Sequence, residues 1–163
     1  MRPEDLITYC GFYGATCGQW CQNKTLRQLS GALLQLVDAM NFSRWRPDDS
    51  RVFEYAEFRK GLGYFSREDT QVVCRKCCQA GEGNDECKVR ICCRQRGYLL
   101  CFDCPEFDHC EHYKDNAERR SEAQYYRAHG KDAWLRRWMD RAERGYEVHA
   151  RACYNISVER DVQ

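Results

Sequence analysis

The residues of this chain most able to do chemistry are its cysteines, 13 among 163 residues. Most of them lie in the segment 72–112, which contains two C-x2-C pairs, Cys74/Cys77 and Cys101/Cys104. The short turn inside such a pair lets both thiolates converge on one tetrahedral metal ion, while nearby backbone N–H groups donate to the sulfurs. Two such pairs in one short segment predict a cysteine-ligated metal site.

Further cysteines lie at ligand-like spacing around these pairs. Cys87 and Cys92 form a looser C-x4-C pair, and Cys110 follows Cys104 by a few residues. Cys10 and Cys17 are remote in sequence and could complete a second four-sulfur site, which would tie the N-terminal region to the segment 72–112. We therefore expect about two metal ions per chain. The predicted ligands are Cys10, Cys17, Cys74, Cys77, Cys87, Cys92, Cys101, Cys104 and Cys110.

Three cysteines and two histidines are interpreted as non-ligands. Cys78 and Cys93 each follow a predicted ligand directly, and neighbouring side chains leave the backbone in different directions. Cys153 lies far from the cluster, and free cysteine is commonly just a small buried hydrophobic residue. His109 and His112 could supply nitrogen, but we favour a position at the surface or at the rim of the core. No local motif supports a catalytic thiol, so a non-enzymatic role is favoured.

Metal ligation is favoured over disulfides by the expected compartment. The N-terminal sequence MRPEDLITYC carries acidic residues and has no apolar stretch typical of a signal peptide. No apolar run approaches the length of a transmembrane helix. We therefore expect a cytoplasmic protein without membrane contact, where thiols stay reduced and clustered cysteines bind metal. An odd number of cysteines also fits poorly with a fully paired disulfide framework.

The elements around the cysteines are predicted to be helical. An amphipathic helix is expected over 24–41, and a second near 49–61, with their apolar faces in the core. Residues 114–145 should be helical with a break at Gly130, and the stripe containing Trp134 and Trp138 should be buried. Residues 1–23 are expected to form turns, and residues after Gly145 a short strand or an extended arm. The apolar stripe of the first helix consists of Leu26, Leu29, Leu33, Leu36, Val37 and Met40.

These expectations define one α-dominated, metal-stabilised domain over residues 1–163, with helices flanking a cysteine-rich, loop-rich segment and little strand. The segment 72–112 has little that could form a conventional apolar core. Metal binding is therefore expected to supply much of its folding free energy.

The cysteine spacing resembles that of an uncharacterised cysteine-rich family, domain of unknown function 3795 (DUF3795). The family's CGLYCGxC-type opening is similar to the sequence from Cys10 to Cys17, although Gly14 stands where the family has a cysteine and Cys21 is the candidate replacement. The segment from Cys87 to Cys110 resembles the family's most specific stretch, with the last cysteine one residue later. The middle C-x2-C pair and the G-x-x-x-W-L element beginning at Gly130 also match. The resemblance implies metal binding without a defined activity.

Two kinds of metal centre remain open. A fully thiolate zinc site leaves no position for water or substrate and would stabilise a binding or interaction module. An iron–sulfur cluster for electron transfer or redox sensing is the alternative, since cysteine-only ligation permits it. The Cys104-Pro105 step is similar to ferredoxin-type sequences, and the resembled family occurs largely in anaerobic bacteria and archaea. Zinc is favoured.

The charge balance bears on partners. The chain has 26 basic and 25 acidic residues, whereas nucleic-acid-binding domains usually show a basic excess. Between Cys74 and Arg96 basic residues outnumber acidic ones, which we interpret as compensation for the negative charge of a tetrathiolate metal site. Nucleic acid is therefore not expected as a partner, whereas an unidentified protein partner fits an interaction module.

Overall fold

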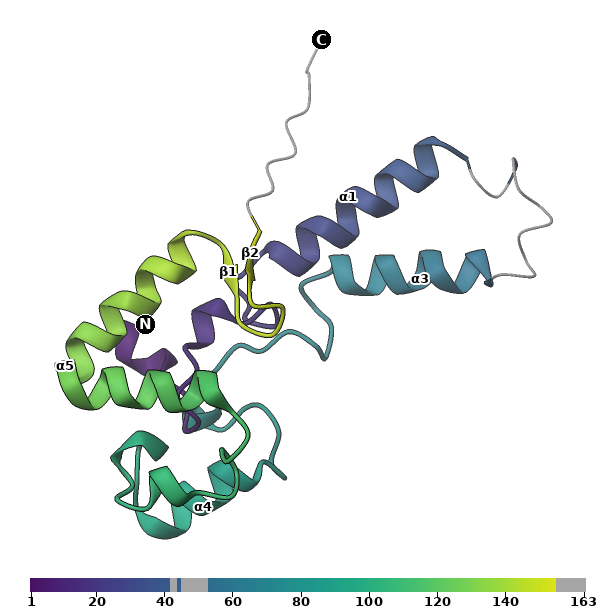
Figure 1. The fold of residues 1–163 in the computed structure, drawn as a ribbon. Helices are drawn as coiled ribbons and strands as arrows, with labels where there is room; N and C mark the ends of the chain where they lie inside the picture. The colour runs from purple at the N-terminus through teal and green to yellow at the C-terminus, as the bar shows by residue number, and fades with distance from the viewer. Residues whose placement is uncertain (42–43, 45–52, 155–163) are drawn as a thin grey trace.

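The computed structural model describes residues 1–41, 44 and 53–154. Its helices are α1 (Thr25–Ala39), α3 (Tyr55–Ser66), α4 (Lys88–Arg96) and α5 (Ala117–Glu143). Strands β1 (Tyr146–Glu147) and β2 (Ala152–Cys153) pair antiparallel as a short hairpin (Figure 1). This confirms the helix-rich fold with little strand; the predicted short strand after Gly145 is β1.

Helix α5 shows the break that the sequence predicts. Gly130 has φ +79°, a left-handed conformation that ordinary residues adopt only with strain, and the helix changes direction there (Figure 1). The Asn116 side chain caps its start by accepting a hydrogen bond from the backbone N–H of Arg119, 3.0 Å away. Beyond the break, Trp134 and Trp138 are fully buried, as their spacing indicates.

One hydrophobic core joins the N-terminal segment, the cysteine-rich segment and α5. Phe102 and Phe107 lie at its centre with rings 5.2 Å apart, and Phe102 also contacts Trp134 edge-on. The expectation that the segment 72–112 lacks apolar core material is therefore wrong. Its aromatic residues, together with Leu100, do not recur with helical or strand period, because they come from irregular turns. Only the tertiary fold brings them together.

Gly11 is required where the N-terminal segment meets this core. It has φ +76°, and a Cβ added there would lie 2.3 Å from an atom of the Phe102 ring. No other residue type fits this space without moving the ring. The glycine thereby allows the backbone next to Cys10 to pack directly against the aromatic centre.

Helices α1 and α3 form a hairpin that projects from the rest of the described structure (Figure 1). They are joined by an ion pair between Arg59 and Asp38, 2.6 Å, and by a hydrogen bond from the Tyr55 hydroxyl to the Val37 carbonyl, 3.4 Å. The second helix starts at Tyr55 rather than near 49; residues 49–52 lie outside the described residues. Phe53 and Ala56 are apolar residues of the predicted segment 49–61, whose apolar face was expected in the core, and both are exposed.

The apolar stripe of α1 is a larger difference from the sequence prediction. Val37 is buried, but Leu29, Leu33, Leu36 and Met40 are 40–58% exposed. Helical periodicity identifies an apolar face correctly but does not determine what covers it. In the described part of the chain, no helix is long and apolar enough to cross a membrane.

Candidate metal centre

The N-terminal segment runs through the cysteine-rich segment and makes hydrogen bonds to it. The Ile7 carbonyl accepts a hydrogen bond from the Cys77 thiol, 3.1 Å. The Tyr9 carbonyl accepts one from the backbone N–H of Cys101, 2.9 Å, and lies 3.9 Å from the Cys93 sulfur. These hydrogen bonds bring together residues more than 60 positions apart in sequence, without any contribution from a metal.

Five cysteines converge on one small, partly enclosed cavity of about 30 Å³. Two of them come from α4 and three from the turns that follow it. A space of this size holds one ion or one water molecule. The cysteines are Cys92, Cys93, Cys101, Cys104 and Cys110, and the remaining wall is formed by Val89, Tyr98, Phe107, His112 and Tyr113.

The environment of this cavity opposes the accumulation of thiolate charge. Burial, reinforced by the neighbouring cysteines, raises the pKa of Cys93 to about 12. Burial likewise raises the pKa of Cys101, whose sulfur lies 3.4 Å from the Tyr113 hydroxyl. Several adjacent thiolates are stable in such a place only with a compensating cation, and a bound metal ion would supply that charge.

Basic side chains lie at the edges of this group. Arg96 Nη1 lies 3.9 Å from the Cys104 sulfur and also pairs with Glu106. Arg119 is almost fully buried, and its charge favours the thiolate form of Cys10, although burial raises the pKa of Cys10 overall. Such cationic neighbours favour deprotonated cysteine ligands.

A second group of cysteines forms where the loop 17–21 meets Cys74. The backbone N–H of Cys74 donates to the Gln19 carbonyl, 2.7 Å, and its carbonyl accepts from the N–H of Cys21, 2.9 Å. The pKa of Cys17 is raised, first by burial and then by the negative charge of Cys74 and Glu147. Cys17, Cys21 and Cys74 therefore lie in one neighbourhood, which we call the loop group.

The adjacent cysteines Cys77 and Cys78 are not among the residues that line the cavity. The side chains of Cys77 and Cys78 interact, and this coupling lowers the pKa of Cys78 and raises that of Cys77. The Tyr9 N–H and the charge of Arg90 also favour the Cys78 thiolate. Arg90 is buried, donates to the Glu82 carbonyl at 3.1 Å, and pairs with Asp85 at 2.9 Å.

Two cysteines occupy positions that the sequence pattern does not indicate. Cys93, interpreted as a non-ligand, is part of the cavity wall and is 2% exposed. Cys87, interpreted as a ligand, precedes α4 as its N-cap and is not among the residues that line the cavity. The signal for Cys93 is its helical spacing of four from Val89, another residue of the cavity wall. Cys153 is exposed on β2.

All 13 cysteines are free thiols. Within residues 1–41, 44 and 53–154, no group of three or more histidine, cysteine, aspartate or glutamate side chains is already arranged to hold a metal ion. The cavity brings together five sulfur atoms, the donor type that thiophilic metals prefer, without placing them in the geometry of a metal site.

Residues 6–115 match the sequence profile of a family described as a protein of unknown function, DUF3795. This match covers more than half of the chain and includes every cysteine except Cys153. The chain belongs to the DUF3795 family. No curated protein and no solved structure gives a significant match. The family range ends just before α5, so the DUF3795 part of the chain contains both cysteine groups and the α1/α3 hairpin.

Proposed function

We propose that this DUF3795 protein is a cysteine-ligated metal-binding protein in which zinc stabilises an interaction module. The observation that carries the proposal is the convergence of five cysteines from α4 and the following turns on one cavity of about 30 Å³. The loop group is the candidate for a second site. About two zinc ions per chain are expected.

A structural role for the metal is favoured over a catalytic one by the size of the cavity. Sites for small-molecule ligands usually have volumes of several hundred Å³. The cavity here is about 30 Å³, and its non-cysteine wall is mostly apolar or aromatic. A metal ion with four sulfur ligands in this place would have no open position for water or substrate. It would instead fix α4 and the turn at Cys101–Cys104 against the N-terminal segment.

An iron–sulfur cluster is the alternative, and the cysteine-only donor set supports it as well. A cluster is larger than a single ion, so its accommodation would require the cavity walls to move apart. This size argument favours zinc.

Elemental analysis of protein purified without oxygen, together with its visible spectrum, tests both assignments. Colourless protein with near two zinc ions per chain is the expected result. Brown protein with iron and acid-labile sulfide would replace zinc by an iron–sulfur cluster. Well-folded protein without any metal would contradict both.

A further inference from the structure

The exposed face of α1 has the spacing of a coiled-coil seam. Starting from Leu26, apolar residues follow at alternating steps of three and four residues, which is the a/d pattern of a heptad repeat. The exposed part of this seam, which we call the leucine seam, consists of Leu29, Leu33, Leu36 and Met40, with 40%, 41%, 58% and 53% of their surface accessible. Four adjacent large apolar side chains at this exposure are unusual for a monomer surface.

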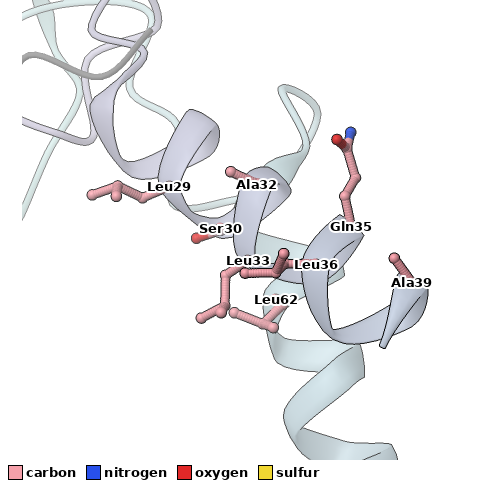
Figure 2. A pocket seen from close by; sticks show the side chains of 8 residues that line it. All are labelled: Leu29, Ser30, Ala32, Leu33, Gln35, Leu36, Ala39 and Leu62. Atoms are coloured by element: carbon pink, nitrogen blue, oxygen red, sulfur yellow. The ribbon is translucent and has the colours of Figure 1, made fainter. Parts of the chain in front are cut away.

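Helix α3 does not cover this seam, because it packs on a different face of α1. A Cβ added at Gly63 of α3 would lie 4.0 Å from Leu34, and one added at Gly31 of α1 would lie 3.6 Å from Ser66. The ion pair between Asp38 and Arg59 lies on the same face as Leu34. Figure 2 shows Leu29, Leu33 and Leu36 on the outer side of α1, with Leu62 of α3 beside Leu33 at its edge.

The charges of α1 indicate what kind of partner fits. The charged residues of α1 are Arg27 and Asp38, and both are engaged away from the seam. Arg27 is buried and donates to the Cys21 carbonyl, while Asp38 pairs with Arg59. The residues that flank the seam are uncharged; they include Ser30, Ala32 and Ala39. A partner helix with charged flanking residues would find no opposite charge on this face. An identical face has no charged flanking residues, so its binding would remove no charge from water.

We propose that the leucine seam binds the leucine seam of a second copy of this chain, around a two-fold axis. In coiled coils, charged flanking residues select unlike partners and set orientation, and their absence here leaves a self-complementary face. On α3, Phe58 and Phe65 share a helix face with Leu62 and are exposed, so they extend the apolar surface beyond α1. Two such hairpins would pair as a four-helix bundle.

The position of the hairpin allows this pairing. It projects from the rest of the described structure, so a second hairpin can approach α1 without displacing the core that holds the cavity (Figure 1). The small side chains of Ala32 and Ala39 beside the seam permit close approach of two helix backbones. Dimerisation would not require the metal centre, so the two proposals fail independently.

Sedimentation equilibrium of the full chain, from about 1 µM to about 100 µM, tests the proposal. The wild-type chain should show a monomer–dimer equilibrium. The variant Leu33→Glu/Leu36→Glu should weaken the dimer by about 100-fold or more, because two central apolar anchors are replaced by charge. The control Gln28→Glu/Gln124→Glu adds the same charge to two exposed positions that do not line the groove of the leucine seam, one on α1 and one on α5. It should dimerise as the wild type does.

Circular dichroism verifies that each variant keeps its helix content. If the double variant loses helix, Leu36→Gln replaces it, because Leu36 is 58% exposed and its side chain contributes little to the monomer fold. A wild-type chain that stays monomeric over the whole range overturns the proposal and would assign the face to a different partner. A larger assembly, or equal dimerisation of wild type and the seam variants, overturns it as well.

Discussion

Arg119 donates a hydrogen bond from Nη1 to the carbonyl of Gly11, 2.8 Å away, and thereby fixes the backbone directly after Cys10. Its guanidinium carbon lies 3.6 Å from the centre of the Phe12 ring. Nη2 lies 3.8 Å from a carboxylate oxygen of Glu118, and neither Nε nor Nη2 has a hydrogen-bond partner among the described residues. A buried cation with unused donors is costly unless negative charge lies nearby; the Glu118 carboxylate provides such charge, and the thiolate form of Cys10 would add to it.

Replacing Arg119 with Met should therefore weaken metal binding. If Cys10 is a ligand, as its position in the sequence predicts, we expect about a 10-fold loss in metal affinity, as for other residues that orient a metal ligand, measured by competition with a chromogenic chelator. Arg119→Lys keeps the charge and should retain part of the affinity. The control is Arg136→Met, which makes the same substitution at an exposed residue of the same helix. Unchanged zinc affinity in Arg119→Met would limit the role of Arg119 to packing.

Gly11 gives a prediction about the core that is independent of metal. The change Gly11→Ala would place a methyl group 2.3 Å from a Phe102 ring atom at a residue with φ +76°. Steric overlap and backbone strain together should lower the free energy of unfolding by about 3 kcal/mol. Gly61→Ala is the matched control, since nothing lies within 4 Å of the added atom inside helix α3. That change should raise stability by about 1 kcal/mol. Equal unfolding midpoints for the two variants in a urea titration would contradict this account.

The success of the sequence prediction differs between elements for physical reasons. The break at Gly130 and the buried tryptophans of α5 follow from local signals, a residue that tolerates positive φ and a strong apolar stripe. The helix α1 was predicted for the same reason. The exposure of its apolar face was not predicted, because exposure depends on which neighbouring element packs against that face. Periodicity carries no such information.

The candidate site shows the same limit. The paired cysteine spacing indicates that Cys101 and Cys104 approach each other, and both line the cavity. The place of Cys93 depends on the rotation of α4 and on its contact with Tyr9, 84 positions away in sequence. Local spacing cannot determine such long-range contacts. The helical period within α4 is the local signal that would have placed Cys93 with Val89.

Metal removal should loosen the cysteine-rich segment more than the α1/α3 hairpin. We expect faster amide hydrogen exchange in α4 and in residues 101–110 after chelation, because the metal would crosslink the turns that carry the cysteines. The α1/α3 hairpin is held by its own packing and by the pair of Arg59 and Asp38, and should keep its protection. Exchange that stays unchanged at residues 88–110 after complete metal removal would show that no metal supports this segment.

The last prediction decides between two assignments of a ligand. The spacing of Cys87 and Cys92 predicts Cys87 as a ligand, whereas the structure places Cys93 in the wall of the cavity and Cys87 outside it. If the cavity is the metal site and Cys93 is one of its four sulfur ligands, Cys93→Ala should lower the metal content by about one equivalent. Cys87→Ala should retain the metal and lose at most a small amount of stability.

Metal content by mass spectrometry of purified variants gives the measurement, with Cys153→Ala as the control for loss of an exposed thiol. Cys101→Ala should lose metal under either assignment, because Cys101 belongs to a C-x2-C pair and also lines the cavity. It therefore shows that the assay detects loss of a ligand. Loss of metal in Cys87→Ala with full retention in Cys93→Ala would favour the assignment from sequence spacing. The metal would then draw Cys87 toward Cys92, and the cavity lined by Cys93 would be a packing gap in the core.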